Sequence, residues 1–218
     1  MSNGRGERGE ESKRDISKSG RTRERLIEAA IDEIAEKGFR DAKVSGIVAR
    51  VGYTQPTFYL HFKSKDAIRE HLADRVQTEL RVVISNAKIP AEAEHYRIGD
   101  KISNAIEALL QYFIDNPKLA SIGYFDSDFN AALREEIVAL ISQNVAFEQG
   151  AGFCRPELDP TFVSQCFNGT LERLIRVYLL SGRYDAPTLA RLAGDLYGHG
   201  MVPGHPGLRE KKEAPELP

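Results

Sequence analysis

Residues 43–65 read KVSGIVARVGYTQPTFYLHFKSK, and this stretch decides the fold. Two short segments have helical character, at about residues 43–50 and 55–60, and only four residues separate them. Gly52 lies in that connection, where a residue without a Cβ atom permits a tight turn. Two short helices joined by a glycine-containing turn predict a helix-turn-helix motif between Lys43 and His61.

The start of the second helix carries small, uncharged side chains. Thr54 is placed to cap this helix, and Pro56 falls in its first turn, where a missing N–H group costs nothing. Gln55 has the amide needed to pair with adenine, and Pro56 and Thr57 offer apolar or hydroxyl contacts. This chemistry predicts contacts with base edges, and Tyr59, His61 and Lys65 add a polar flank.

The charge of the chain is unevenly distributed. The net charge is −2, but residues 1–66 hold 14 Lys and Arg against 11 Asp and Glu, and the rest holds 16 against 21. The window from Ala42 to Lys65 has four basic residues and no acidic one. A surface free of carboxylates suits an approach to phosphates, although chance in a short window gives the same pattern.

The remainder of the chain predicts an all-α protein. Apolar residues at helical spacing precede the motif and stop at Gly38: Leu26, Ile27, Ala30, Ile31, Ile34 and Ala35. Further helices are expected at about 64–86, 97–115, after Asn116-Pro117, and at 127–149, 160–180 and 186–197. We expect a disordered arm at 1–20, a DNA-binding domain at 21–66, a regulatory and dimerisation domain at 67–199 and a flexible tail at 200–218.

Several function classes are disfavoured by what the sequence lacks. Cys154 and Cys166 form no ligand-spaced pair, so we expect neither a disulfide framework nor a metal site. No signal peptide or membrane-length apolar segment is present, which favours a soluble, cytoplasmic protein. The motifs of common hydrolases and nucleotide-binding enzymes are absent and the histidines are scattered, so we expect no catalysis and no cofactor.

The run IVARVGYTQPTFYLHFKSK at 47–65, with Leu26-Ile27-Glu28-Ala29-Ala30 and Gly38-Phe39 before it, resembles the N-terminal domain of TetR-family regulators. The resemblance covers about residues 21–72. It implies phosphate contacts by Tyr59, His61 and Lys65, and a base-reading turn at Gln55, Pro56 and Thr57. It also implies a regulator, most often a repressor, bound to double-stranded DNA.

Three positions depart from the family pattern. Ala42 stands where relatives usually have a capping Thr or Ser, Ser45 where some members have a base-reading Arg, and Val48 where the usual residue is Ala. Lys43, Ser45, Arg50 and Thr54 complete the set of candidate DNA contacts. For Arg50 a solvated helix end is an equal alternative to a phosphate contact. Arg21 and Arg23 either reach the phosphate backbone or only keep the arm soluble. Phe58 and Phe62 are expected in the core.

The last two helices are the candidate dimer interface, because they are apolar over more than one face and contain the small residues Gly169, Ala190 and Ala193. A dimer would read two halves of a palindromic operator. The middle helices resemble the family's ligand-sensing body in layout. Six aromatic residues either line a cavity for a small apolar or aromatic ligand or fill a core: Tyr112, Phe113, Tyr124, Phe125, Phe147 and Phe167. A regulator without a small-molecule ligand is the alternative.

Overall fold

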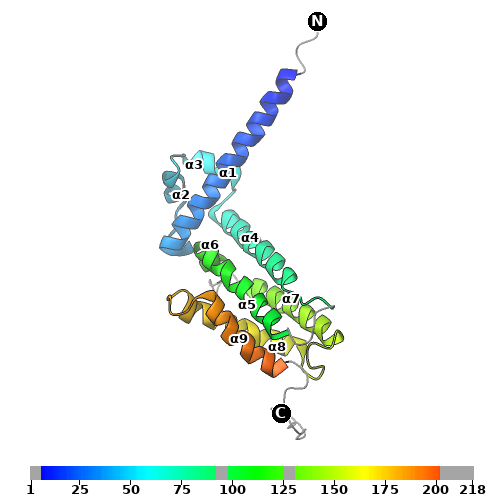
Figure 1. Ribbon diagram of the computed structural model, residues 1–218. Helices are drawn as coiled ribbons and strands as arrows, with labels where there is room; N and C mark the ends of the chain where they lie inside the picture. Colours follow the sequence, from blue (N-terminus) through cyan, green and yellow to red (C-terminus); the bar gives the residue numbers. More distant parts are fainter. Residues whose placement is uncertain (1–5, 92–97, 125–130, 202–218) are drawn as a thin grey trace. The chain divides into compact units, whose positions relative to one another are not determined.

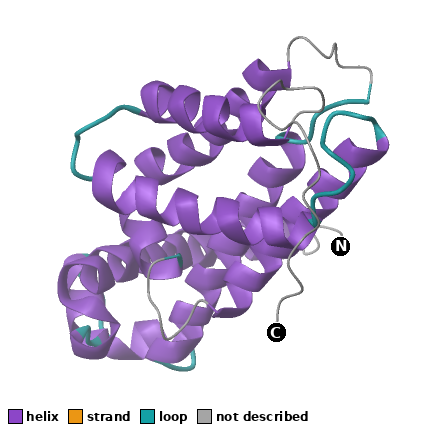
Figure 2. Cartoon of the chain, turned by 90° about the horizontal axis from the view of Figure 1, so that it is seen from below, coloured by secondary structure: helices purple, strands orange, loops and turns teal. Residues whose placement is uncertain are grey.

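The computed structural model describes residues 6–91, 98–124 and 131–201. Within these ranges all regular structure is helical and no strand occurs, which confirms the predicted all-α class (Figure 2). The elements are α1 (Gly6–Asp41), α2 (Val44–Arg50), α3 (Gln55–His61), α4 (Lys65–Asn86), α5 (Ile98–Asp115), α6 (Pro117–Gly123), α7 (Ala131–Gly150), α8 (Pro160–Leu174), the π-helical turn η2 (Ile175–Leu179) and α9 (Ala186–Met201) (Figure 1).

Helix α1 begins at Gly6, within the segment that we expected to be a disordered arm. Glu, Lys and Arg are frequent in residues 6–20, and these residues extend a nucleated helix at little cost. Near its other end, Gly38 has a φ of 76°, and one further turn follows before Asp41. The predicted interruption at Gly38 is therefore confirmed, because only glycine adopts this conformation without strain.

The chain divides into two compact units. The first holds α1, α2, α3, α6 and the part of α4 that ends at Thr78, and the second holds α4 from Glu79 together with α5, α7, α8, η2 and α9. The sequence-based boundary after residue 66 thus differs from the division in the structure. Helix α6 packs against α1, and the Lys118 Nζ atom lies 2.7 Å from Asp32 Oδ1.

The core of the first unit explains why the motif folds. The apolar stripe of α1 is buried, with Leu26 and Ala30 fully covered, and Phe58 of α3 and Ile68 of α4 are buried as completely. Phe62 is 5% exposed. Phe58 and Phe62 are core residues, as the sequence predicts, so α3 is attached to the unit by its apolar side.

In the second unit, α5 and α9 pack closely. A Cβ atom built on Gly194 of α9 would lie 2.1 Å from Ser103 Oγ and 2.9 Å from Ser103 Cα on α5. One turn later, a Cβ atom built on Gly198 would lie 3.8 Å from the nearest atom, Gly99 Cα. Gly194 therefore marks the point where the backbones of the two helices come so close that no side chain fits between them.

No helix among the described residues has the length and apolar character needed to cross a membrane.

Candidate functional site

Helix α3 presents one exposed face. Gln55 and Pro56 in its first turn are exposed, Tyr59 is 53% exposed and Leu60 is 83% exposed, while Phe58 between them is fully buried. His61 is half-buried at the end of the helix. A helix held by one buried aromatic residue and bare on its outer side is suited to enter the major groove of DNA. Leu60, which is not among the predicted contacts, offers a large apolar side chain on this face.

The turn before α3 is supported from α1. Gly52 has a φ of 68°, as a tight turn requires, and the Tyr53 N–H donates to the Val48 carbonyl at 2.9 Å. Arg25 of α1 donates to Tyr53 Oη at 3.0 Å and to the Val51 carbonyl at 3.4 Å. Arg25 therefore ties the turn between α2 and α3 to α1, and the local sequence gives no sign of this contact.

Neither helix of the motif has a side-chain cap. The N-terminal cap position of α2 is Lys43, which has no acceptor group. Thr54 has the cap position of α3, but its Oγ1 lies 3.1 Å from Thr57 Oγ1 and accepts no backbone N–H. The capping role expected for Thr54 is therefore wrong for this structure. Lys43 and Ser45 are exposed, so both remain accessible to DNA.

Arg50 joins α2 to α1. Its Nε lies 2.9 Å from Glu33 Oε2 and its Nη2 lies 2.5 Å from Glu36 Oε2. The hydrogen bonds to Glu36 and Glu33 raise the pKa of Arg50. Lys37 Nζ, 2.7 Å from Glu33 Oε1, makes the largest contribution to lowering the pKa of the buried Glu33. The Arg50 guanidinium is thus committed to two carboxylates within the unit.

Lys65 closes the end of α1. Its Nζ donates to the carbonyls of Phe39 at 2.7 Å, Ala42 at 2.8 Å and Arg40 at 3.2 Å. An ammonium group has three hydrogens, and these three bonds use all of them. The phosphate contact that the family resemblance implies for Lys65 would require these bonds to break, and in this structure the residue ties the start of α4 to the last turn of α1.

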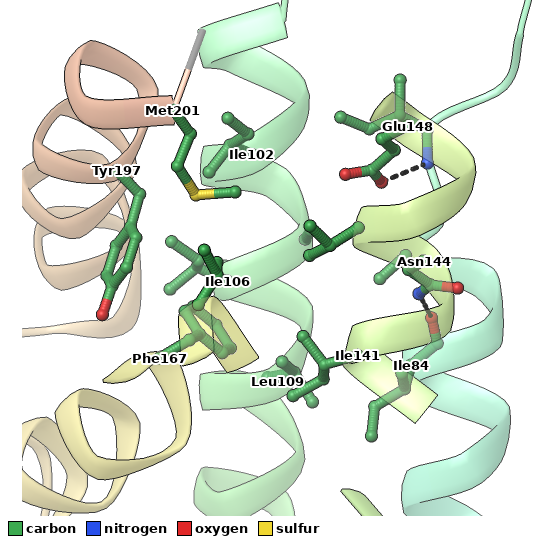
Figure 3. A pocket seen from close by; sticks show the side chains of 15 residues that line it. Ile84, Ile102, Ile106, Leu109, Ile141, Asn144, Glu148, Phe167, Tyr197 and Met201 are labelled. Atoms are coloured by element: carbon green, nitrogen blue, oxygen red, sulfur yellow. Dashed lines mark hydrogen bonds between the residues drawn. The ribbon is translucent and has the colours of Figure 1, made fainter. Parts of the chain in front are cut away.

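The second unit contains an apolar cavity of about 100 Å³ (Figure 3). Helices α5 and α7 provide much of the wall, and α4 with the segment that follows it, α8 and α9 complete it. Its lining residues are Ile84, Ala87, Ile89, Ile102, Ala105, Ile106, Leu109, Ile141, Asn144, Val145, Glu148, Val163, Phe167, Tyr197 and Met201. Asn144 and Glu148 lie near Ile141 on one face of α7. Two polar residues within an apolar stripe are therefore the feature of the sequence that indicates this site.

Of the six aromatic ligand candidates, Phe167 lines this cavity. Tyr112 is buried outside it and donates to Glu79 Oε2 at 3.0 Å, next to the buried ring of Phe113. Phe147 is 39% exposed on α7. Tyr124 is buried in the first unit, and Phe125 lies outside the described residues.

Comparison with known proteins agrees with this geometry. Residues 26–72 match the family described as bacterial regulatory proteins, tetR family. An uncharacterised HTH-type transcriptional regulator of Bacillus subtilis, YdgC, is 32% identical over 187 residues, which cover 86% of this chain and 96% of YdgC. The fatty acid metabolism regulator protein of the same organism is 23% identical over 186 residues, covering 81% and 93% of the two chains.

Solved structures show the same fold. The complex of SmeT with triclosan superposes with a TM-score of 0.68 at 19% identity and covers 88% of this chain and 99% of SmeT. SmeT is the repressor of a multidrug efflux pump of Stenotrophomonas maltophilia. The match to YdgC extends over both units, and these relatives are regulators rather than enzymes. The chain therefore belongs to the TetR family of DNA-binding transcriptional regulators.

Proposed function

We propose that this regulator is a repressor that binds a palindromic operator as a homodimer and leaves it when a small molecule occupies the cavity. The exposed face of α3 carries this proposal. Gln55 and Pro56 stand bare at its first turn, and no acidic residue occurs between Ala42 and Lys65 to repel the DNA backbone. A protein with this partner acts where the chromosome lies, in the bacterial cytoplasm.

The homodimer is proposed to form through α8 and α9. Phe162 of α8 is 66% exposed, and Leu192 and Leu196 of α9 are 47% and 67% exposed. The two leucines are four residues apart and therefore share one helical face. Apolar side chains gathered on two adjacent helices favour burial against a second copy, which would create a four-helix bundle.

Leu196→Glu is expected to convert the dimer to a monomer, because a carboxylate would be buried against its symmetry mate. Sedimentation at micromolar concentration should then give a 24.3 kDa species instead of twice that mass. Leu60→Glu is the matched control, since Leu60 is even more exposed but belongs to α3. If both variants remained dimers, the α8 and α9 interface would be wrong.

Ligand control is supported by the cavity and by the course of α4. A fully filled second unit would leave no room for a ligand, but this unit retains an apolar cavity. Ile84 of α4 lines it, and the same helix begins at Lys65, next to the motif. A ligand that shifts α4 would therefore change the populations of DNA-binding and non-binding arrangements in a dimer.

Selection of DNA fragments by the purified protein is the direct test of this proposal. We expect the selected sites to be palindromic with half-sites about one helical turn apart, because each protomer contributes one α3. Placing a selected site over a promoter in a reporter strain should lower transcription, and deleting the regulator should restore it. Selection of single half-sites would contradict the dimer, and higher transcription in the presence of the regulator would contradict repression.

A further inference from the structure

Three polar side chains line the cavity of the second unit, and two of them already donate a hydrogen bond within the protein. Among its polar lining residues, Asn144 donates through Nδ2 to the Ile84 carbonyl at 3.0 Å. The Tyr197 hydroxyl donates to Thr170 Oγ1 at 2.8 Å. The third polar residue, Glu148, brings a carboxylate. A ligand in this cavity therefore meets the amide of Asn144 and the carboxylate of Glu148 on α7, and apolar side chains over most of the remaining wall.

Glu148 is only 8% exposed and makes no ion pair at contact distance within the described part of the chain. One oxygen, Oε1, accepts the Ile89 N–H at 3.2 Å, and Oε2 has only the Cys154 thiol at 3.7 Å. In Figure 3 the carboxylate oxygen that is not bonded to Ile89 points to the side where Ile102 and Met201 lie. Lys88 is next to Ile89, but its Nζ lies 3.4 Å from the centre of the Phe147 ring.

We infer that the cavity binds a small apolar amine in its ammonium form, paired with Glu148. This inference rests on the proposed function only in taking the cavity as the ligand site. A buried carboxylate without a cation is costly, and an ammonium ligand relieves that cost while its hydrocarbon part covers the apolar wall. A carboxylate ligand would meet a like charge, and an alcohol would contribute only a neutral hydrogen bond.

Glu148 is the one carboxyl group among the described residues that line the cavity. Burial raises the pKa of Glu148, against smaller lowering effects of the Ile89 hydrogen bond, Cys154 and Lys88. Burial also raises the pKa of the Cys154 thiol to about 12 and raises that of Tyr197, so both stay neutral. Helices α5 and α8 line the cavity with apolar side chains alone.

The sign of the pH dependence follows from these charges. Below its pKa Glu148 is protonated and must lose a proton to pair with an ammonium ion, so amine affinity rises with pH by up to about tenfold per pH unit. Above that pKa the affinity is constant, because an aliphatic amine remains protonated up to about pH 10. An alcohol of the same length should show no such rise.

The test is calorimetric titration of the full chain with straight-chain amines from butylamine to octylamine, each beside the alcohol and carboxylate of equal length. We expect amines to bind best, with an affinity that increases with pH until Glu148 is ionised. Glu148→Gln, which keeps an acceptor but removes the charge, should weaken amine binding about ten- to hundredfold and abolish its pH dependence. Glu135→Gln, at an exposed position of the same helix, is the matched control.

Two results would overturn the inference: alcohols or carboxylates binding as tightly as the amines, or pH-independent amine binding by the unaltered protein. The pH dependence of amine binding is measured on the unaltered protein, so this test remains valid even if Glu148→Gln fails to fold. Release from the selected operator is measured separately. Amine binding without release from the operator would support the amine site and contradict ligand control. Release by another compound, without amine binding, would support ligand control and contradict the amine site.

Discussion

Gln55→Ala is expected to lower affinity for the selected operator by about ten- to hundredfold and leave binding to unrelated DNA nearly unchanged. The reason is that Gln55 stands exposed in the first turn of α3, where its amide can pair with a base, and one such pair contributes about 1–3 kcal/mol of discrimination. Fluorescence anisotropy with specific and scrambled duplexes measures the two affinities in one buffer.

Tyr59→Ala should instead weaken binding to both duplexes. Tyr59 is 53% exposed on the same face, and we expect its hydroxyl to contact phosphate, which carries no sequence information. Tyr59→Phe separates the hydroxyl from the ring. Gln111→Ala, an exposed position on α5 of the second unit, controls for the loss of an amide outside the motif. Equal affinities of the Gln55 and Gln111 variants would refute base contact by Gln55.

Gly194→Ala is expected to destabilise the second unit by about 1–3 kcal/mol, as overpacking does in a closely packed interior. Rotation of the Ser103 hydroxyl relieves one clash, but the Ser103 Cα atom at 2.9 Å remains, so α5 and α9 must separate. Thermal unfolding followed by circular dichroism measures the change. The midpoint should fall by about 2–4 °C per kcal/mol in a chain of this length.

Gly198→Ala provides the matched comparison. Both glycines are buried on α9, one turn apart, but the added methyl group at Gly198 has 3.8 Å to its nearest neighbour. Alanine is also the better helix former by about 1 kcal/mol, so this variant should be as stable as the parent or more stable. If Gly194→Ala matched Gly198→Ala in stability, the close approach of α5 and α9 would not exist in solution.

The parts of the fold that the sequence predicted well depend on local chemistry. The bounds of α2 and α3 lie within one residue of the expected ones, because Gly52 and Pro56 determine the turn and the helix start by their own backbone preferences. The interruption of α1 at Gly38 was predicted for the same reason. The start of α1 was not, because helix extension through polar residues leaves no apolar pattern to detect.

The partners that Arg50 and Lys65 have within the protein could not be predicted from the sequence. Lys65 bonds to the carbonyl of Phe39, which is 26 positions away, and Arg50 bonds to Glu33, which is 17 positions away. Such distances in sequence are set by how α1 packs against its neighbours, and a basic residue looks the same whether it faces phosphate or carboxylate. The ligand site could not be predicted from aromatic residues, because aliphatic side chains form most of the cavity and Glu148 supplies its carboxylate.

The internal bonds of Arg50 and Lys65 also affect how many counterions are released from DNA when the protein binds. Each cation that neutralises a phosphate releases about 0.9 counterion from the duplex. Four basic residues lie between Ala42 and Lys65. Lys43 and Lys63 are exposed and have no bond to another side chain or carbonyl in the described part of the chain. Arg50 is paired with two carboxylates, and the three N–H groups of Lys65 are taken by carbonyls of the protein. A count of basic residues would therefore overstate the entropy of ion release, and binding should survive moderate ionic strength better than the composition of the motif implies.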